Sequence, residues 1–335
     1  MAQRVHVLSP DVSEKIAAGE VIERPASVVK ELVENSLDAG ATDITVILED
    51  GGKRLIQVVD NGFGMGRSDL SLCTERHATS KLKQVDDLLK LSTLGFRGEA
   101  LPSIAAVAEL SILSREKDSS QTLEVKKDLT GRMTPPQPVT FGHFLGTSHG
   151  TQIRVEGLFS QIPARLKFLK SSGAELAHVR EWIERLALTK SSTGFKLVSH
   201  DKTVLNLRPE SPEKRILSVL SDENNYPVVY HEQKDPIQGI RLQAYWLQGL
   251  SSAQTKKLVQ IVNGRVLRDR LLQQAMMSAF RQSLLPGQFP AVALMMEIDP
   301  SQIDVNVHPT KTEIRFLHSS KIFQAVQDLL SEMIE

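Results

Sequence analysis

Hydrophobic positions repeat at two spacings along the chain. Apolar residues at every third or fourth position predict helices, and strict alternation predicts strands. The clearest helical pattern covers residues 25–39, which open with a proline and are followed by Gly40. Residues 10–18 show the same pattern, with Gly19 expected just past the helix end. Residues 44–48 and 55–59 alternate around Asp50-Gly51-Gly52 and predict a β-hairpin.

The rest of the pattern predicts two successive runs of mixed elements. In the first run, strands are expected at 110–113, 122–126 and 151–155, and helices at 99–108 and 174–188. In the second, strands are expected at 195–198, 204–207, 240–247, 258–262 and 291–298, and helices at 212–220, 270–284 and 320–334. This mixture predicts two α+β domains, with the polar segment 201–213 as their boundary.

Composition limits the class of protein. The 335 residues are 41% hydrophobic, which is enough for two domains with substantial cores. Lys and Arg together number 40, as do Asp and Glu, so the formal net charge is zero. Any contact with nucleic acid must therefore come from a local basic patch, and it should weaken strongly with added salt.

Three further features concern the compartment. The single cysteine, Cys73, excludes an internal disulfide and fits a reducing environment. No run approaches the roughly 20 apolar residues of a membrane span. The N-terminus carries charge and no apolar run, so it is not a signal peptide. We therefore expect a soluble, cytoplasmic protein with no membrane partner.

The helix predicted at 25–39 has polar residues beside its apolar face. Glu31, Asn35 and Asp38 form a stripe that borders the buried face, where the wall of a pocket would lie. Lys30 and Glu34 are expected to point toward water. Taken alone, such a stripe is more often a solvated helix edge than a site. The expected core-facing positions are Val28, Val29, Leu32, Val33, Leu37 and Ala39.

Several short segments have the composition of ligand-binding loops. Asp60-Asn61-Gly62-Phe63-Gly64 follows an apolar strand; its glycines permit close approach of the backbone to a ligand, and Asp60 offers an acceptor. For this segment alone, a hairpin turn is the slightly favoured interpretation. Thr79-Ser80-Lys81 precedes the run Gly95 to Leu101, which opens a helix and could receive phosphate oxygens. The P-loop pattern Gly-x-x-x-x-Gly-Lys-Ser/Thr does not occur.

In this order and spacing, the motifs resemble those of the GHKL superfamily of ATPases, and most closely those of the MutL family of DNA mismatch repair proteins. The segment Ile16 to Ala41 is similar to the family's opening motif along its whole length. The resemblance spans almost the entire chain. Its other motifs are Arg76-His-Ala-Thr-Ser-Lys81, Gly95-Phe-Arg-Gly-Glu-Ala-Leu101, Pro163-Ala-Arg-Leu-Lys-Phe-Leu169 and Val305-Asn-Val-His-Pro-Thr-Lys311.

The resemblance implies an α+β fold with two domains. Residues 1–205 would form a GHKL, or Bergerat-type, ATP-binding α/β sandwich, and residues 206–335 a smaller α/β domain like the second domain of ribosomal protein S5. The implied activity is slow hydrolysis of ATP with Mg²⁺, used as a switch that orders a lid and brings two copies together on DNA. The implied partners are DNA bound without sequence preference, a mismatch-recognition protein of the MutS type, and a downstream nuclease or helicase.

The resemblance also assigns roles to individual residues. Glu31 would be the general base for the attacking water, and Lys311 would reach the γ-phosphate from the second domain. Asn35 would hold Mg²⁺ through its amide oxygen, and Asp60 would accept the adenine amino group. For Thr151, a structural hydroxyl is as good an interpretation as a nucleotide contact. The other expected nucleotide contacts are Asp38, Gly62, Gly64, Thr79, Ser80, Lys81, Gly95, Phe96, Arg97, Gly98, Glu99, Ala100 and Leu101.

Two clusters of cations are the expected DNA contacts. Arg265, Arg268 and Arg270 lie in the second domain, and Arg165 and Lys167 in the first. Charge clusters are usually solvated faces, so it is the resemblance to DNA-binding relatives that makes these residues candidates for phosphate contacts.

Two other classes of protein are alternatives. A type II topoisomerase ATPase subunit is disfavoured by the motif Gly95 to Leu101 and by the lack of a strand-passage region. A non-enzymatic DNA clamp or chaperone-like scaffold would bind ATP only as a ligand, and measuring phosphate release would separate it from an ATPase. The chain has no metal-binding motif for a nuclease, and we expect it to be a fragment without the family's linker and dimerisation domain.

Overall fold

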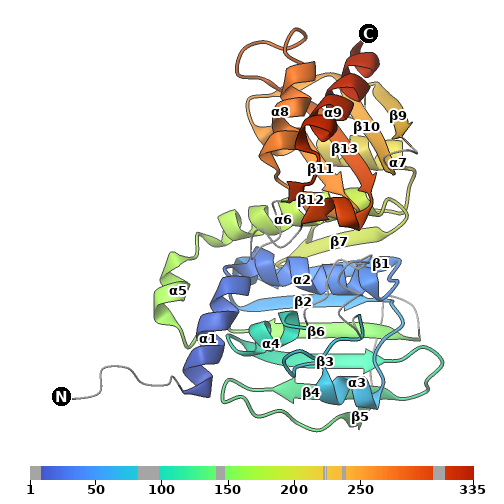
Figure 1. The fold of residues 1–335 in the computed structure, drawn as a ribbon. Coiled ribbons are helices and arrows are strands. Elements are labelled where there is room, and N and C mark those ends of the chain that lie inside the picture. Colours follow the sequence, from blue (N-terminus) through green and yellow to red (C-terminus); the bar gives the residue numbers. More distant parts are fainter. Residues whose placement is uncertain are drawn as a thin grey trace. The chain divides into compact units, whose positions relative to one another are not determined.

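The computed structural model describes residues 9–81, 98–140, 148–221, 223, 225–235, 239–304 and 314–335. These residues form two units, each organised by one large sheet with helices packed on it (Figure 1). The first unit comprises the described parts of Met1–Lys83, Gly95–Ile183 and Thr193–Arg208. The second is formed mainly by Glu184–Ser192 and Pro209–Glu335. The chain thus has the mixed α/β architecture that the sequence predicts.

An eight-stranded sheet organises the first unit. Its order is β5-β4-β3-β6-β2-β1-β7-β8, and all neighbours are antiparallel except β1 and β7. The predicted hairpin is confirmed, because β1 and β2 pair with Ile44 opposite Asp60 around a 3-10 turn (η1, Asp50–Gly52). The strands are β1 (Asp43–Glu49), β2 (Leu55–Asp60), β3 (Glu109–Arg115), β4 (Thr122–Lys127), β5 (Gln137–Val139), β6 (Gly150–Glu156), β7 (Gly194–Ser199) and β8 (Lys202–Leu207).

One face of this sheet is apolar and packs against helices. Val46, Val58, Ile153, Ile112 and Val125 form a row across β1, β2, β6, β3 and β4, and all five are buried. Directly opposite residues point to the same face of a sheet, so this row marks the side on which α2 and α4 pack. The helices of this part of the chain are α1 (Pro10–Val21), α2 (Pro25–Asp38), α3 (Arg67–Leu72), α4 (Ala100–Ala105), α5 (Pro163–Phe168) and α6 (Ser172–Thr189).

Helix α2 forms where the sequence predicts it, with Pro25 in its first turn. Of its predicted core positions, Val28, Val29, Leu32 and Val33 are buried, whereas Leu37 and Ala39 at the C-terminal end are only partly buried. Burying this arc against the sheet stabilises the helix far more than its intrinsic propensity does.

The prediction that Lys30 and Glu34 point to water is wrong. Their side chains are only 17% and 11% exposed, with Lys30 Nζ 3.9 Å from Glu34 Oε1. The same Nζ lies 5.5 Å from the centroid of the Trp182 ring on α6. A second helix therefore covers the side of α2 that the periodicity assigned to solvent.

Helix α1 is longer than predicted, because it continues through Gly19 to Val21. A Cβ at Gly19 would lie 1.7 Å from Nη2 of Arg165 on α5. The Arg165 guanidinium also donates from Nη1 to the carbonyl oxygen of Ile22 at 2.9 Å and lies 5.5 Å from the centroid of the Phe159 ring. Glycine occurs here because another side chain approaches the helix closely, and not because the helix ends.

A five-stranded sheet of order β12-β11-β13-β10-β9 organises the second unit. Strands β11 and β13 are parallel, and the other neighbours are antiparallel. One face forms a continuous core with α8 and α9. The elements are α7 (Pro212–Leu220), β9 (Val228–Asp235), β10 (Ile240–Ser252), β11 (Leu258–Val262), β12 (Arg265–Leu267), α8 (Arg270–Ala279), β13 (Phe289–Ile298), β14 (Ile303–Asp304), β15 (Arg315–Phe316) and α9 (Ser319–Ile334).

Helix α8 ends earlier than the predicted residue 284. Its C-cap residue Phe280 is completely buried, with its ring centroid 5.4 Å from that of Trp246. Burial of this ring turns the chain into the core and stops the helix at Ala279. No helix in the described ranges is long and apolar enough to cross a membrane.

The buried Arg215 explains why residues 184–192 belong to the second unit. Its guanidinium on α7 donates to the carbonyl oxygens of Ala187 at 2.9 Å and Ser191 at 3.1 Å, and its Nε to Glu210 Oε1 at 2.8 Å. These bonds satisfy carbonyls at and beyond the C-terminus of α6, which a helix leaves without intrahelical partners.

Candidate functional site

Asp60, the last residue of β2, is a buried carboxylate held by helix α2. Ser36 Oγ donates to Asp60 Oδ2 at 2.8 Å, and the Gly62 amide donates to Oδ1 at 2.9 Å. Burial raises the pKa of Asp60 above its ordinary value, and the hydrogen bonds from Ser36, Gly62 and Thr151 oppose that rise. The result is a desolvated acceptor in a fixed orientation at the end of a strand.

Asp60 belongs to a polar row at the end of the apolar sheet face. Asp60 on β2 lies opposite Thr151 on β6, and Thr151 lies opposite Ser114 on β3. All three are buried. Thr151 Oγ1 is 3.0 Å from Ser114 Oγ, which also accepts from the Met65 amide at 2.8 Å. Adjacent rows on this face are apolar, so polar chemistry is concentrated at this end of the sheet.

The glycines of the Asp60 segment pack against backbone on two sides. A Cβ at Gly62 would lie 2.8 Å from the carbonyl oxygen of Ala39, and one at Gly64 would lie 2.0 Å from that of Arg115. Gly64 also has φ +71°, a conformation that glycine adopts at little cost. Close approach of protein backbone is therefore sufficient to explain both glycines.

Asn35 and Asp38 bring two oxygens to one cation. Lys81 Nζ lies 3.0 Å from Asn35 Oδ1 and 2.5 Å from Asp38 Oδ2. All three side chains are partly buried. The Lys81 amide also donates to Thr79 Oγ1 at 3.1 Å, which fixes the turn that carries it. Ser80, between them, is exposed.

Glu31 lies one helical turn before Asn35 on α2. Its side chain is 20% exposed, and its Oε1 lies 3.8 Å from Lys30 Nζ. The carboxylate thus stands at the partly exposed margin of the helix, beside the buried arc.

Two predicted segments are only partly within the described residues. Gly98, with φ +62°, packs against Ala78, and Glu99 Oε1 lies 2.9 Å from His77 Nδ1. Ala100 and Leu101 open α4. Gly95, Phe96, Arg97 and Lys311 lie outside the described residues.

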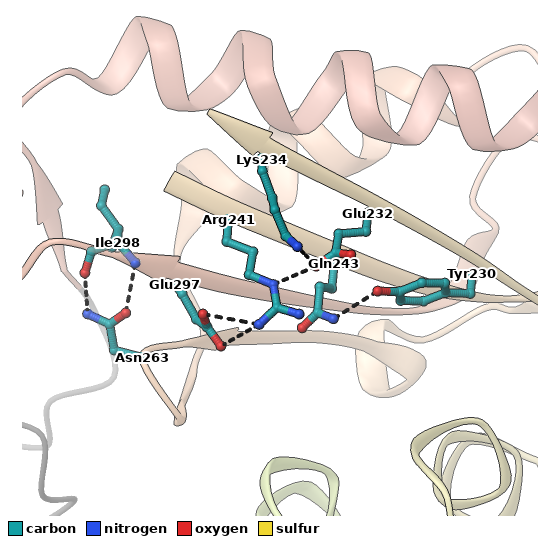
Figure 2. A network of polar contacts seen from close by, with 8 residues as sticks. All are labelled: Tyr230, Glu232, Lys234, Arg241, Gln243, Asn263, Glu297 and Ile298. Carbon is teal, nitrogen blue, oxygen red and sulfur yellow. Dashed lines mark hydrogen bonds and ion pairs between the residues drawn. The ribbon is translucent and has the colours of Figure 1, made fainter. Parts of the chain in front are cut away.

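The predicted DNA contacts have different surroundings. In the second unit, Arg268 and Arg270 are exposed and Arg265 is partly buried. Asn263 orders the turn before them: its side chain exchanges two hydrogen bonds with the Ile298 backbone, of 2.8 and 2.9 Å (Figure 2). In the first unit, Arg165 is engaged with α1.

The Figure 2 network also includes an ion-pair cluster on the sheet, in which Arg241 Nε lies 2.5 Å from Glu232 Oε1. Hydrogen bonding to Arg241 lowers the pKa of Glu232. The cluster is half-buried to exposed and has both signs of charge, whereas the residues near Asn263 are basic.

Sequence reasoning missed Ser36 and Ser114. Ser36 stands on the helix that carries Asn35, at a position where a polar residue interrupts the buried apolar arc. That interruption indicates, from the sequence alone, a side chain with a polar partner inside the protein. The sequence around Ser114 does not indicate its contact with Thr151, because that contact depends on the strand register that places the two residues opposite each other.

The fold and this site define a class of protein. Residues 22–151 match the family profile described as histidine kinase-, DNA gyrase B- and HSP90-like ATPase. Residues 217–335 match the profile described as DNA mismatch repair protein, C-terminal domain. The Asp60 segment and helix α2 both lie within the first match.

Solved structures of this class are similar over nearly the whole chain. A structure described as the N-terminal domain of a DNA repair protein has a TM-score of 0.77 and 26% identity, covering 95% of this chain and 96% of that one. The Aquifex aeolicus MutL ATPase domain complexed with ADP has a TM-score of 0.65 and 26% identity, with coverage of 93% and 98%.

Curated relatives identify the family. MutL of Trichlorobacter lovleyi is 43% identical over 335 residues, covering 100% of this chain and 55% of the relative. MutL of Azorhizobium caulinodans is 45% identical over 320 residues, covering 92% and 49%. The chain belongs to the MutL family of DNA mismatch repair proteins and contains its ATPase region. It spans about half the length of the curated relatives it matches. The family assignment decides against a topoisomerase subunit.

Proposed function

We propose that the chain binds Mg-ATP and hydrolyses it slowly, as a nucleotide-controlled switch in DNA mismatch repair. One observation carries the proposal: helix α2 places Ser36 on the carboxylate of Asp60 and places Asn35 and Asp38 on the Lys81 ammonium. A single helix thus contacts the acceptor that would bind the purine, Asp60, and carries the oxygens that would bind a cation, those of Asn35 and Asp38. The ADP complex of the similar Aquifex aeolicus domain supports a nucleotide in this fold.

Asp60 would recognise the adenine. A buried carboxylate held by Ser36 and Gly62 keeps acceptor capacity toward a ligand, and the adenine amino group is a donor. The 6-oxo group of guanine would instead bring an acceptor against this acceptor. That difference selects ATP over GTP.

Asn35 would hold Mg²⁺, with Asp38 supporting it. Hard oxygen ligands suit Mg²⁺, and the convergence of Asn35 Oδ1 and Asp38 Oδ2 on one ammonium indicates that these oxygens fit a cation. When bound, the ion would neutralise charge on the phosphates. Lys81 would then contact the phosphates beside it, together with Thr79, Ser80 and the segment 95–101.

Glu31 would orient and deprotonate the attacking water. A general base needs a carboxylate that water can reach, which fits the partly exposed position of Glu31 at the helix margin. Lys311, from the second unit, would stabilise charge on the γ-phosphate.

The test separates binding from hydrolysis. We expect Glu31→Ala to bind ATP with wild-type affinity and to lose at least about a hundredfold in phosphate release, the usual scale of general-base catalysis. Asn35→Ala should lose binding. Glu23→Ala, an exposed carboxylate near the start of α2, is the matched control and should behave as wild type. Calorimetry and a phosphate-release assay provide the two measurements.

Normal turnover by Glu31→Ala would refute the base assignment. Phosphate release by the wild type is measured with and without DNA, because a scaffold that only binds ATP would release none under either condition.

The proposed partners are DNA, a second copy of the chain and other repair proteins. Arg265, Arg268, Arg270 and Lys167 would contact DNA phosphates without sequence preference, and a net charge of zero makes such binding depend on these local patches. Two copies would associate when ATP is bound, in a cytoplasmic protein that also meets a MutS-type protein and a downstream nuclease or helicase.

A further inference from the structure

We infer that Ser114 is a positioning residue. It determines that the Thr151 hydroxyl donates rather than accepts a hydrogen bond between the two, and it holds the backbone at Met65, which follows the glycine loop (residues 60–64). The inference rests on the proposed nucleotide site. Ser114 lies on β3, is fully buried, and is not part of the motifs that carry the family resemblance. Its hydroxyl nevertheless joins three segments that surround Asp60.

The Ser114 hydroxyl has three partners. The Met65 amide lies 2.8 Å from its oxygen, the Gly150 carbonyl oxygen 3.0 Å, and Thr151 Oγ1 3.0 Å. Met65 follows the glycine loop, and Gly150 and Thr151 open β6. One side chain on β3 therefore ties the loop after β2 to the start of β6.

The available hydrogens determine the direction of each bond. A hydroxyl has one hydrogen and two lone pairs. The Met65 N–H can only donate, and the Gly150 carbonyl can only accept, so Ser114 uses its hydrogen on Gly150 and a lone pair on Met65. The contact with Thr151 then requires Thr151 to donate.

Thr151 consequently presents only lone pairs to its other neighbours. Asp60, directly opposite it in register, is also an acceptor. Two acceptors side by side favour a ligand edge that donates, such as the 6-amino group of adenine or a water that it orders. Ser114 thereby adds to the preference of this site for a 6-aminopurine over a 6-oxopurine.

Ser114 also fixes the loop in space. Its neighbour Arg115 has its carbonyl oxygen where a Cβ of Gly64 would be, so β3 holds this loop at two consecutive residues. Without the Ser114 hydroxyl, the partly buried Met65 amide loses its acceptor, and the loop keeps only the hydrogen bonds of its other residues, such as those of Phe63 with Ala39 and Lys117.

The test is Ser114→Ala, with Ser111→Ala as the matched control. Ser111 lies on the same strand, and its hydroxyl bonds Glu124 at 3.2 Å, away from the row of Asp60. We expect Ser114→Ala to raise KM for ATP about tenfold, the effect of one lost hydrogen bond, with kcat unchanged because Glu31 is untouched. The ratio of affinities for ATP and inosine triphosphate should fall, because Thr151 regains a hydrogen for the 6-oxo group.

Two further measurements complete the test. Hydrogen exchange should show the Met65 amide protected in the wild type and in Thr151→Val, and unprotected in Ser114→Ala. In a Thr151→Val background, Ser114→Ala should no longer change the ATP-to-inosine-triphosphate ratio, because the hydroxyl that it reorients is gone.

The outcomes are distinguishable. Wild-type chain that binds no ATP would refute the proposed function. Wild-type binding with an unchanged KM and ratio in Ser114→Ala, or equal changes in Ser111→Ala, would overturn the role of Ser114 alone. If Ser114→Ala does not fold, Thr151→Val decides: the inference requires a lower ratio with Met65 still protected, and an unchanged ratio overturns it.

Discussion

At the scale of single residues, Asp60 shows how a group proposed to bind ligand can oppose stability. A buried carboxylate is costly unless hydrogen bonds offset its desolvation. At Asp60 the desolvation exceeds the hydrogen bonds from Ser36, Gly62 and Thr151, since its pKa is raised. Ionisation of Asp60 is therefore less favourable in the folded chain than in the unfolded chain.

Asp60→Asn should therefore stabilise the fold while it weakens ATP binding. The Asn amide can accept from Gly62 and donate to Ser36, whose hydroxyl then donates to the Leu32 carbonyl at 3.1 Å. We expect the free energy of unfolding at pH 7 to increase, because the neutral amide avoids the desolvation of a buried carboxylate. Urea unfolding and calorimetry measure the two effects.

The pH dependence has a definite sign. Because the folded pKa of Asp60 is raised, its protonated form stabilises the native state below the ordinary value of 3.8, and this contribution is lost as pH rises through the folded pKa. The advantage of Asp60→Asn should shrink as the pH falls toward 4. The exposed Asp43→Asn is the control; an advantage that grows on acidification would contradict the assignment.

At the scale of elements, the contact between α1 and α5 accounts for a glycine that a helix does not favour. Glycine within a helix costs about 1 kcal/mol relative to alanine. Here the space of its Cβ is occupied by the Arg165 guanidinium, which also bonds the carbonyl of Ile22 near the end of α1. The two residues fit as a pair, and α1 leads directly into α2 and its site residues.

A double-mutant cycle tests this pair. Gly19→Ala in the wild type should destabilise by about 1 kcal/mol, since it displaces the guanidinium from a hydrogen bond and an aromatic face. In an Arg165→Ala background the same change should stabilise by a similar amount, because helix propensity then decides. Urea unfolding measures both. If Gly19→Ala changes the free energy of unfolding in the same direction in both backgrounds, Arg165 does not occupy this space.

At the scale of the whole molecule, the proposed switch depends on association of two chains. Each unit has its own sheet and core, and a net charge of zero gives no general repulsion between copies. A ligand that binds one state better than another shifts the population by its differential affinity. ATP is the expected ligand.

Light scattering tests this directly. With a saturating non-hydrolysable ATP analogue, the wild-type mass should double, whereas Asn35→Ala should keep the monomer mass because it does not bind. Calorimetry on the same samples establishes occupancy. An analogue-bound wild type with unchanged mass would refute a dimerising switch in this part of the chain.

The sequence by itself determined the main elements and the family. Helix α2, the β1–β2 hairpin and the α/β class follow from periodicity and turn residues, because these express local backbone preferences and the need to bury one face. The motifs carried the family resemblance, since a ligand site requires fixed residue types at fixed spacing. Edge strand β9 and short helix α5, which have mixed polarity, did not stand out.

Only the tertiary structure decided what each position touches. Gly19 has the sequence of a helix end but lies within a helix, where the guanidinium of Arg165, distant in sequence, lies against it and leaves no space for a Cβ. Glu34 follows the period of an exposed residue and is buried near Lys30 and beneath a second helix. Ser114 meets Thr151 only through strand register. Such contacts join segments far apart in the chain, and local propensity contains no information about them.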